Sequence, residues 1–373
     1  MRITKRKVAL FLFGAFWVAS AIYFLKQSAE ETGSKSRVRP TSNNAIKVDP
    51  SLSSNSKSKT DELVVPVCLT GDSSRIGGMI SAINSVQANT KHHVKFYLVT
   101  DEKNVAHLKN YIEKTSLRNI DYTIKVFNED LVKNKVLVRG GRQELASPLN
   151  YARFYISEMF PELSGRLIHL DDDTIVQGDI AELYKTHIEA NHVMAVSDDC
   201  SSVSKRFTFI QNTYANYINF NNAQIKKLHM SPIACAFNTG VYVADLTRWK
   251  KQNITAKIEY WMKLNTEQEI YGNEKGGGGS QPPMMIALYK KYTLMDPMWH
   301  VRNLGWSPSG KRYSKEFLQS AKLLHWNGRF KPWGRKSQAA DIWDKYFIKD
   351  PEERFRPLRR DLKRATLSGS INT

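Results

Sequence analysis

Hydrophobic runs and helix-like patterns alternate along the chain from Leu63 onward. An apolar run at 63–70 predicts a buried strand, and apolar residues then recur at helical spacing from Ile76 to Val86. The alternation continues with predicted strands at 93–100, 122–128 and 166–170, and with predicted helices near 105–111 and 148–159. This order predicts an α/β domain with a mostly parallel sheet, helices on both faces, and a ligand site beyond the carboxyl ends of the strands.

A second pattern occupies the amino terminus. Residues 8–25 form an uncharged apolar run. Four basic residues come before it, and Lys26 comes directly after it. As a helix this run would be about 27 Å long, enough to span a thin bilayer. We expect a signal-anchor with residues 1–7 cytoplasmic and the rest lumenal, in the Golgi or endoplasmic reticulum membrane. A cleaved signal peptide is the alternative, because residues 19–21 resemble a cleavage site, although apolar residues continue beyond them.

The segments that flank the predicted domain are polar. Residues 26–62 are rich in Ser, Lys, Asn and Pro, which predicts a disordered stem. The α/β domain is expected over residues 63–350, and residues 351–373 are expected to form a basic, solvated tail.

The net charge changes the choice of partner. The 373 residues carry a formal charge of +19 with 41% apolar content, which excludes disorder as the main state and suggests phosphate-bearing partners. Residues 1–62 hold +6 and residues 351–373 hold +3, so the middle holds only +10, without a concentrated basic segment. We therefore expect no nucleic-acid partner. A membrane-anchored protein that binds phosphate groups or nucleic acid stays an alternative that rests on charge alone.

Cysteines and one sequon bear on the compartment. Three cysteines are too few for a disulfide scaffold. One bridge is compatible with an oxidising lumen, and Cys200 and Cys235 are the nearer pair, but the sequence does not decide the pairing. The Asn253-Ile254-Thr255 sequon predicts a glycosylated surface position if this part of the chain is lumenal.

Three adjacent carboxylates end the predicted strand at 166–170. Asp171, Asp172 and Asp173 repel one another unless a cation neutralises them, and hard oxygen ligands suit Mn²⁺ or Mg²⁺ bridging to a diphosphate. In an extended segment Asp171 and Asp173 share a face, and Asp172 points away. The alternative is a solvated acidic turn that caps the next helix.

A second candidate string begins where another predicted strand ends, at 323–325. His325 would complete a metal site, Gly328 would let backbone N–H groups approach an anion, and Lys331 would supply positive charge. The alternative for His325 is a structural histidine before a turn.

Three strings together resemble a known family. HLDDDTIVQGDI, FNTGVYVADLTRW and HWNGRFKPW are similar, in order and separation, to segments of glycosyltransferase family 8. Members of that family have the GT-A fold, use nucleotide-sugar donors and retain anomeric configuration. The resemblance covers about residues 64–333, extends toward 347, and is closest to the animal type II membrane members.

The resemblance implies a role for each matching residue. Asp171, Asp173 and His325 would bind Mn²⁺, Gly328 and Lys331 would hold the donor diphosphate, Arg153 would reach the donor, Asn238 would lie near the donor sugar, and Asp72 would pair with uracil. The aromatic residue that often follows the uracil-binding acid is replaced here by Arg75. The plainer alternatives are a surface ion pair for Arg153 and a turn for Asn238.

One departure from the family affects the reaction itself. Many members carry an Asp-Gln pair beside the donor sugar, and here Ser280 and Gln281 occupy those positions. Gln281 is expected to contact the sugar, and the glycine run at 276–279 predicts a mobile loop. The leading hypothesis is a lumenal, Mn²⁺-dependent retaining transferase that moves a hexose or pentose from a UDP-sugar to an unknown glycan, protein or lipid acceptor. The alternative is a protein that binds UDP and metal but has weak or no transferase activity.

Three tryptophans are candidates for stacking on sugar rings. Trp299, Trp306 and Trp326 lie close in sequence to the second candidate string. For each of them a place in the core is the alternative.

Overall fold

The computed structural model describes residues 63–139, 143–201, 203, 211–272, 279–307 and 313–358. The expected cytoplasmic tail, membrane anchor and stem lie outside these residues, as do residues 276–278 of the glycine run that predicts a mobile loop. Within the described part of the chain, none of the helices has both the length and the apolar character needed to cross a membrane.

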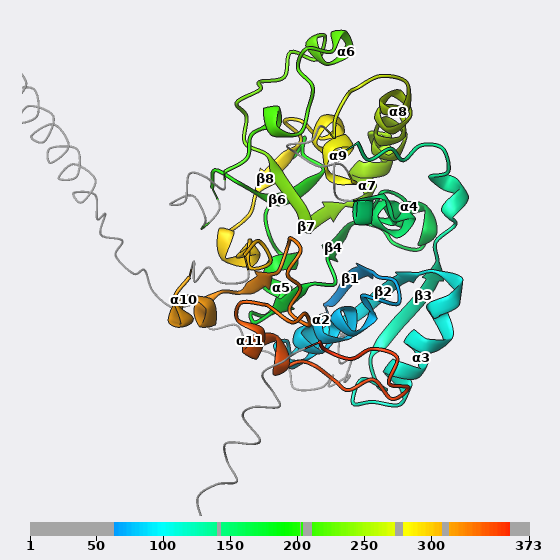
Figure 1. The fold of residues 1–373 in the computed structure, drawn as a ribbon, viewed down its shortest axis with the longest axis vertical. Coiled ribbons are helices and arrows are strands. Elements are labelled where there is room, and N and C mark those ends of the chain that lie inside the picture. The colour runs from blue at the N-terminus through cyan, green and yellow to red at the C-terminus, as the bar shows by residue number, and fades with distance from the viewer. Residues whose placement is uncertain are drawn as a thin grey trace, which may run out of the picture. The chain divides into compact units, whose positions relative to one another are not determined.

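A seven-stranded sheet forms the centre of the domain, with the strand order β3-β2-β1-β4-β7-β6-β8 (Figure 1). Its strands are β1 (Val64–Thr70), β2 (His93–Thr100), β3 (Asp121–Val126), β4 (Arg166–Leu170), β6 (Met194–Asp198), β7 (Phe237–Asp245) and β8 (Tyr292–Leu294). Neighbouring strands run parallel except at β7, which is antiparallel to both β4 and β6. The predicted mostly parallel sheet is therefore confirmed, with one reversed strand inside it.

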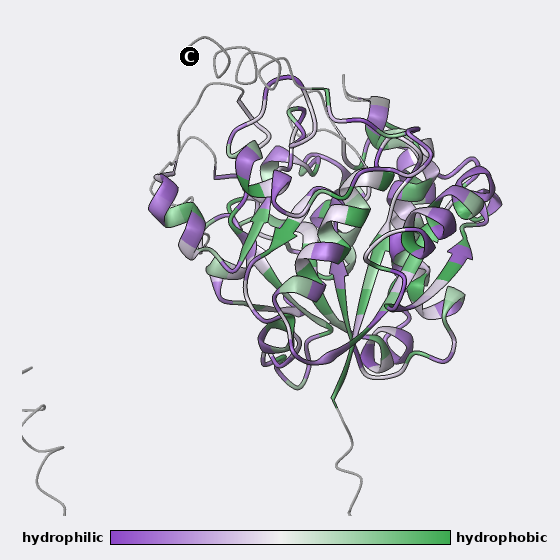
Figure 2. Ribbon diagram, turned by 90° about the horizontal axis from the view of Figure 1, so that it is seen from below, coloured by the Kyte–Doolittle hydropathy of each residue, from purple (hydrophilic) through white to green (hydrophobic). Residues whose placement is uncertain are grey.

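Helices cover both faces of this sheet (Figure 1). Two apolar clusters, one on each face, arise because successive strand residues point to opposite sides. In β1, Val65, Val67 and Leu69 join the first cluster with α2 (Ile76–Ala88), α3 (Val105–Glu113), α5 (Ile180–Tyr184), α10 (Lys315–Ser320) and α11 (Ala340–Asp344). Cys68 joins the second cluster with α4 (Ile156–Met159), α7 (Leu246–Lys251), α8 (Ile254–Glu267) and α9 (Gln281–Ala287). Figure 2 shows the strands as the most hydrophobic part of the domain.

Short elements complete the domain around this core. They are α6 (Ala223–Lys226) and the 3₁₀ segments η1 (Glu102–Asn104), η2 (Glu129–Leu131), η3 (Gln143–Ala146), η4 (Pro148–Phe154), η7 (Tyr214–Asn216) and η8 (Pro297–His300). A two-stranded antiparallel sheet pairs β5 (Thr174–Val176) with β9 (Leu323–His325).

Most of the predicted elements are present within a few residues of their expected bounds. The expected helix at 148–159 differs, because the chain forms the 3₁₀ segment η4 followed by one short α-helix. Pro148 opens the segment, and the amide N of Tyr155 donates to the carbonyl O of Ala152, the tighter i to i−3 spacing.

The carboxyl-terminal segment packs further than the expected boundary at 350. Phe355 is buried in the first cluster, where its ring lies 5.9 Å from that of Trp333. The amide N of Leu358 donates to the carbonyl O of Trp333. Residues just beyond 350 therefore belong to the packed domain, because an aromatic anchor and a backbone hydrogen bond hold them there.

Candidate active site

A cavity of about 760 Å³ opens at the carboxyl ends of β1 and β4 and at the start of the antiparallel strand β7. Each residue that the sequence assigned to donor or metal binding lines it, namely Asp72, Arg153, Asp171, Asp173, Asn238, Gln281, His325, Gly328 and Lys331. These residues come from widely separated parts of the chain, so only folding assembles them. Asn253 is outside this group, and it is exposed at the start of α8, as expected for a surface sequon.

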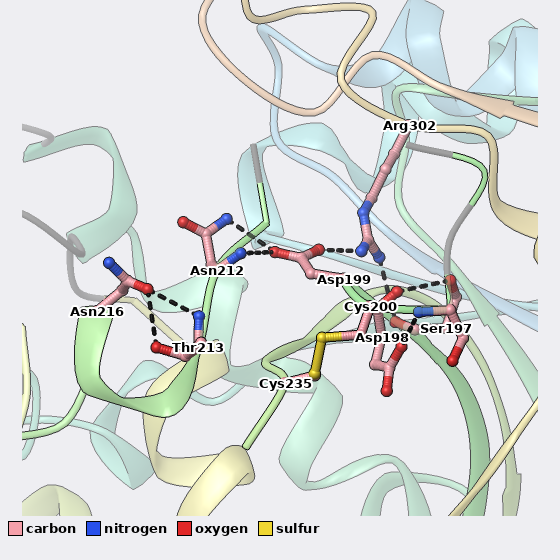
Figure 3. The surroundings of a disulfide bond; sticks show 10 residues. Ser197, Asp198, Asp199, Cys200, Asn212, Thr213, Asn216, Cys235 and Arg302 are labelled. Atoms are coloured by element: carbon pink, nitrogen blue, oxygen red, sulfur yellow. Dashed lines mark hydrogen bonds and ion pairs between the residues drawn. A yellow bond between two sulfur atoms is a disulfide. The ribbon is translucent and has the colours of Figure 1, made fainter. Parts of the chain in front are cut away.

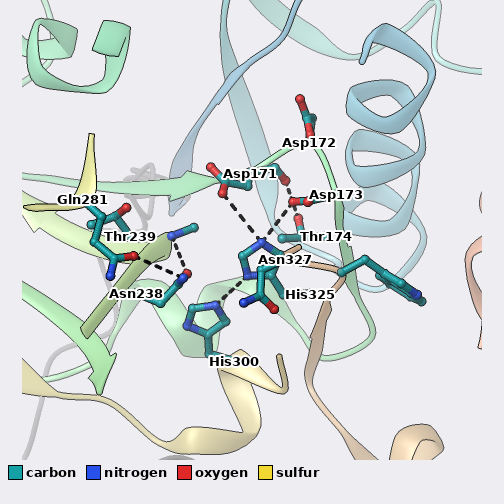
Figure 4. A network of polar contacts seen from close by, with 12 residues as sticks. Asp171, Asp172, Asp173, Thr174, Asn238, Thr239, Gln281, His300, His325 and Asn327 are labelled. Carbon is teal, nitrogen blue, oxygen red and sulfur yellow. Dashed lines mark hydrogen bonds and ion pairs between the residues drawn. The ribbon is translucent and has the colours of Figure 1, made fainter. Parts of the chain in front are cut away.

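Asp171, Asp173 and His325 form a three-residue cluster at the floor of the cavity. Each offers one ligand atom, and these atoms lie within 4.8 Å of one another. Nε2 of His325 lies 3.0 Å from Oδ1 of Asp173 and 3.6 Å from Oδ2 of Asp171 (Figure 4). The antiparallel pairing of β5 with β9 places His325 opposite Thr174, which explains how a residue so distant in sequence reaches the carboxylates.

The donor atoms of this cluster fit a divalent cation. Within the described residues, Nε2 of His325 and Oδ1 of Asp173 are buried without a hydrogen-bond partner. Two carboxylates and one imidazole nitrogen converging on one point are a ligand set suited to Mn²⁺ or Mg²⁺.

Gly240, in β7, supplies the space that the cluster needs. A Cβ atom there would lie 2.2 Å from Cε1 of His325 and 2.8 Å from Oδ2 of Asp171. The amide N of Asp171 also donates to the carbonyl O of Gly240 across 2.7 Å. Any side chain at this position would therefore push the cluster apart.

Basic side chains hold the flanking aspartates ionised. Burial alone raises the pKa of Asp171, but Arg153 and His169 outweigh it and keep that pKa below its ordinary value. Burial likewise opposes ionisation of Asp173, whereas Lys331 and His325 hold its pKa well below the ordinary value. Lys331 contacts Asp173 directly.

Asp172 lies in a different environment from its neighbours. Burial raises the pKa of Asp172 to about 8, although Arg75 opposes this rise, and the carboxylates of Asp173 and Asp171 add to it. Its Oδ2 lies 3.2 Å from Nε of Arg75, on the side that faces α2. This agrees with the expected alternation, in which Asp171 and Asp173 share a direction and Asp172 points elsewhere.

Arg153 connects the cluster to β7. Its guanidinium donates from Nη2 to Oδ1 of Asp171 at 2.9 Å and from Nη1 to the carbonyl O of Thr239 at 2.7 Å. Arg153 is only 5% exposed, so it is not the surface ion pair considered as its alternative.

Asn238 and Gln281 contact each other on one wall of the cavity (Figure 4). Nδ2 of Asn238 lies 3.4 Å from Oε1 of Gln281, and Oδ1 of Asn238 accepts from the amide N of Gly240 at 2.9 Å. Gln281 begins α9, and the preceding Ser280 is buried beside it. The residue that departs from the family pattern thus lies on the wall of the cavity.

The loop after β9 forms another wall. Gly328 has φ +115, a conformation that favours glycine, and a Cβ atom there would lie 2.5 Å from the carbonyl O of Gly305. Nζ of Lys331 also lies 3.3 Å from the carbonyl O of Trp326, which keeps the ammonium over the cavity floor.

Asp72 and Arg75 lie at the carboxyl end of β1. Oδ1 of Asp72 accepts from both the amide N and the hydroxyl of Ser74. The guanidinium of Arg75 lies 5.8 Å from the ring centroid of Trp333 and pairs with Asp172. An arginine held over a tryptophan therefore occupies this wall of the cavity, where the family often has an aromatic residue.

A disulfide lies beside the site and joins Cys200 to Cys235 with a Cα–Cα distance of 5.8 Å (Figure 3). Next to it, Asp199 contacts the buried Arg302 and accepts two hydrogen bonds from Asn212 at 2.8 Å. Asn212 lines the cavity. The bridge and the ion pair thus fix the segment that supplies this part of the wall.

The sequence analysis missed several residues of the site. Nε2 of His300 lies 2.8 Å from Nδ1 of His325, on the side away from the carboxylates. Nε2 of the fully buried His169 lies 3.5 Å from Oδ1 of Asp171. Burial holds the pKa of His300 well below its ordinary value, and it lowers that of His169 to about 4. His169, immediately before the Asp triplet, carried a weak signal by position, and His300 carried none.

Of the three candidate tryptophans, two are core residues. Trp299 and Trp326 are buried, whereas Trp306 is 42% exposed and lines the cavity.

Comparison with known proteins decides the family. The model for glycosyl transferase family 8 matches residues 66–337. The chain belongs to glycosyl transferase family 8. Glycosyltransferase 8 domain-containing protein 1 of Homo sapiens is 43% identical over 300 residues, which cover 79% of this chain and 80% of that protein. Glycosyltransferase 8 domain-containing protein 2 of Macaca fascicularis is 43% identical over 291 residues, covering 77% of this chain and 83% of that protein.

Solved structures agree on the fold of this family 8 member. The galactosyltransferase LgtC, in complex with donor and acceptor sugar analogues, has a TM-score of 0.56 at 15% identity, covering 76% of this chain and 95% of LgtC. The bifunctional glycosyltransferase WbbM has a TM-score of 0.56 at 17% identity, covering 79% of this chain and 51% of WbbM. The domain therefore has a GT-A-like α/β fold. Membership of family 8, and not these structures, supports a glycosyltransferase, an activity that implies a sugar donor and an acceptor.

Proposed function

We propose that the protein is a retaining, metal-dependent glycosyltransferase that moves a hexose or pentose from a UDP-sugar. The observation that carries this proposal is the convergence of Asp171, Asp173 and His325, with Lys331 beside them, in the floor of one cavity. A divalent cation with a basic side chain is the usual means of stabilising a diphosphate leaving group.

In this proposal the diphosphate lies over the cluster. Asp171, Asp173 and His325 would hold Mn²⁺, or Mg²⁺ in its place, which supplies positive charge to the phosphate oxygens as the sugar–phosphate bond breaks. The ammonium of Lys331 already lies at this floor, and Gly328 allows backbone amides to come close to an anion.

The wall of Asn238, Gln281 and Arg153 would contact the donor sugar. Loss of UDP leaves an oxocarbenium-like carbon, which is stabilised by an electron-rich group nearby. The side-chain oxygen of Gln281 is such a group, and its 3.4 Å contact with Asn238 orients the amide. Arg153 holds Asp171 and the backbone of Thr239 in place behind the sugar. Asp72, at the end of β1, would accept from the uracil N–H.

Ser280 supports a second candidate, a protein that binds UDP and metal with weak or no transfer. The hydroxyl of Ser280 carries no negative charge to stabilise an oxocarbenium ion, and the residue is buried at the start of α9. UDP-sugar hydrolysis or transfer that disappears in the metal-site variants would exclude this candidate.

The domain is proposed to act in the lumen of the Golgi or the endoplasmic reticulum. Residues 8–25 would anchor it as a type II membrane protein, with residues 1–7 cytoplasmic, residues 26–62 as a stem and the last residues as a basic tail. The disulfide between Cys200 and Cys235 supports an oxidising compartment. Glycosidase-sensitive modification of Asn253, lost in Asn253→Gln, would test this orientation.

Calorimetry with UDP tests the proposed function. The full-length protein should bind UDP with Mn²⁺ present, and the double variant Asp171→Asn, Asp173→Asn should not. Asp121→Asn is the matched control, because Asp121 is a surface carboxylate on β3 paired with His93. Absence of UDP binding by the wild-type protein with Mn²⁺ would refute the proposal. If UDP does bind, a screen of UDP-sugars would identify the donor.

Trp306 offers a test on the acceptor side. Its ring is partly exposed in the cavity wall, where an aromatic face can stack on the apolar face of a sugar. Trp306→Ala should raise the acceptor KM by about 3- to 10-fold and leave UDP-sugar hydrolysis unchanged. An equal loss of both activities would show that the tryptophan supports the structure of the loop instead.

A further inference from the structure

His300 lies directly behind the candidate metal ligand His325 (Figure 4). Nε2 of His300 and Nδ1 of His325 are 2.8 Å apart, and the two rings are stacked at 17° with centroids 5.1 Å apart. His300 is fully buried at the end of η8, and His325 is 1% exposed at the end of β9. The two imidazoles therefore form one buried pair, with only Nε2 of His325 turned toward the carboxylates.

Backbone contacts keep the pair in register. The amide N of His325 donates to the carbonyl O of Val301 at 2.8 Å, and Val301 forms a parallel bridge with Leu324. On the side of β7, the backbone of Gly240 lies against Cε1 of His325, where a Cβ atom would come within 2.2 Å of that carbon. These contacts hold the backbone of β9 beside the end of η8, where the two rings meet.

The shared contact restricts where the protons of the pair can be. A neutral imidazole has one donor and one acceptor nitrogen, so only one of the two facing nitrogens carries a proton. In one arrangement Nε2 of His300 donates to Nδ1 of His325, and Nε2 of His325 carries a proton that faces Oδ1 of Asp173 at 3.0 Å. In the other, Nδ1 of His325 donates to His300, and Nε2 of His325 presents a lone pair.

Only the second arrangement can bind a cation. A metal ligand must be an unprotonated nitrogen, and the hydrogen bond made by the other nitrogen sets which one that is. In this arrangement the proton of His300 moves to its Nδ1, which has no hydrogen-bond partner in the described part of the chain.

We propose that His300 is a positioning residue that sets the tautomer of His325. Nε2 of His300 accepts from Nδ1 of His325 across the 2.8 Å contact, so the other nitrogen of His325, Nε2, is unprotonated and faces the two carboxylates at 3.0 and 3.6 Å. Without an acceptor at residue 300, Nδ1 of His325 would lose the partner that fixes this tautomer.

Two substitutions separate this role from simple packing. His300→Phe keeps a buried ring but removes the acceptor nitrogen, whereas the amide oxygen of His300→Gln can take the place of Nε2. Mn²⁺ affinity of the full-length protein, measured by electron paramagnetic resonance, should fall about 10- to 100-fold in His300→Phe. It should return close to the wild-type value in His300→Gln. Wild-type affinity in His300→Phe, or an equal loss in both variants, would overturn the proposal.

A control and a spectroscopic readout keep the test independent of folding defects. His107→Phe is the matched control. His107, on α3, is equally buried, and its Nε2 lies 2.9 Å from Oδ2 of Asp350. This variant should leave Mn²⁺ affinity unchanged. In the wild-type protein labelled with ¹⁵N-histidine, long-range ¹⁵N–¹H spectra with saturating Mg²⁺ and UDP should show the proton of His325 on Nδ1. A proton on Nε2 of His325 under these conditions would refute the proposal.

The proposal rests on the proposed metal-dependent function, and the two can fail separately. If the wild-type protein binds no Mn²⁺, the proposed function itself fails. If it binds Mn²⁺ and the affinity depends on Asp171 and Asp173 but not on the nitrogen of residue 300, only the role of His300 fails.

Discussion

Gly240→Ala should remove metal binding while leaving the domain folded. The added Cβ would lie 2.2 Å from Cε1 of His325, whereas carbon atoms pack comfortably at about 3.5–4.0 Å, so the ring has to move by more than about 1 Å. His300 blocks the retreat on one side, and the Cβ would also press within 2.8 Å of Oδ2 of Asp171. Metal–ligand distances tolerate only about 0.2 Å, so His325 would be lost as a ligand.

The expected size of the effect follows from these distances. Loss of a ligand should weaken Mn²⁺ binding at least as much as loss of an outer partner, by about 100-fold or more. Overpacking should lower the free energy of unfolding by about 1–3 kcal/mol. Titration of Mn²⁺ by electron paramagnetic resonance measures the first quantity, and chemical unfolding without metal measures the second.

A control separates the two effects. Gly165→Ala places an alanine at φ +72 with no atom within 4 Å of its Cβ, at the opposite end of β4. It should cost about 1–2 kcal/mol of stability with unchanged Mn²⁺ affinity. Wild-type Mn²⁺ affinity in Gly240→Ala would refute the reasoning, because it would mean that His325 is dispensable or free to move.

Two further perturbations test the support of the site, and a third tests an ion pair elsewhere in the domain. Arg153→Met should lower the free energy of unfolding of the metal-free protein by about 3–5 kcal/mol, because Asp171 loses its buried partner. Saturating Mn²⁺ should restore part of this stability in unfolding experiments. An equal loss with and without Mn²⁺ would contradict the argument. Cys200→Ser with Cys235→Ser should lower the free energy of unfolding by about 2–4 kcal/mol; no change under oxidising conditions would show that the bridge is dispensable. Burial opposes ionisation of Asp350, but amide donors and a histidine keep its pKa below 3.8. The ionised carboxylate therefore stabilises the fold at neutral pH, and this contribution is lost as the pH falls below that value. Asp350→Asn should flatten the acid limb of a plot of stability against pH, and an unchanged limb would count against this account.

The amino-acid sequence determined the local elements and the chemistry that they carry. Apolar periodicity was sufficient to place β1, α2, β2 and β4, because burial on one or both faces of an element leaves its period in the sequence. The Asp triplet followed a buried strand, so its position at a carboxyl end was predictable as well. Similarity of three strings to a known family then predicted the cavity residues, and all of them line one cavity.

Other features were decided only by tertiary structure. The reversed strand β7 lies between β4 and β6, and strand order depends on contacts between distant segments that leave no local period. The 3₁₀ form of η4 and the packing of Phe355 depend on neighbours in the same way.

The site itself shows the same division most clearly. The sequence determined which side chains could bind a cation, because ligand chemistry belongs to each residue and follows it along the chain. The three-dimensional arrangement decided which of these side chains meet, through the pairing of β5 with β9. It also placed His300 against His325, a contact that no sequence motif predicts. Hydrogen bonds of this kind depend on distance and orientation in space, and those are set only when the whole domain has folded.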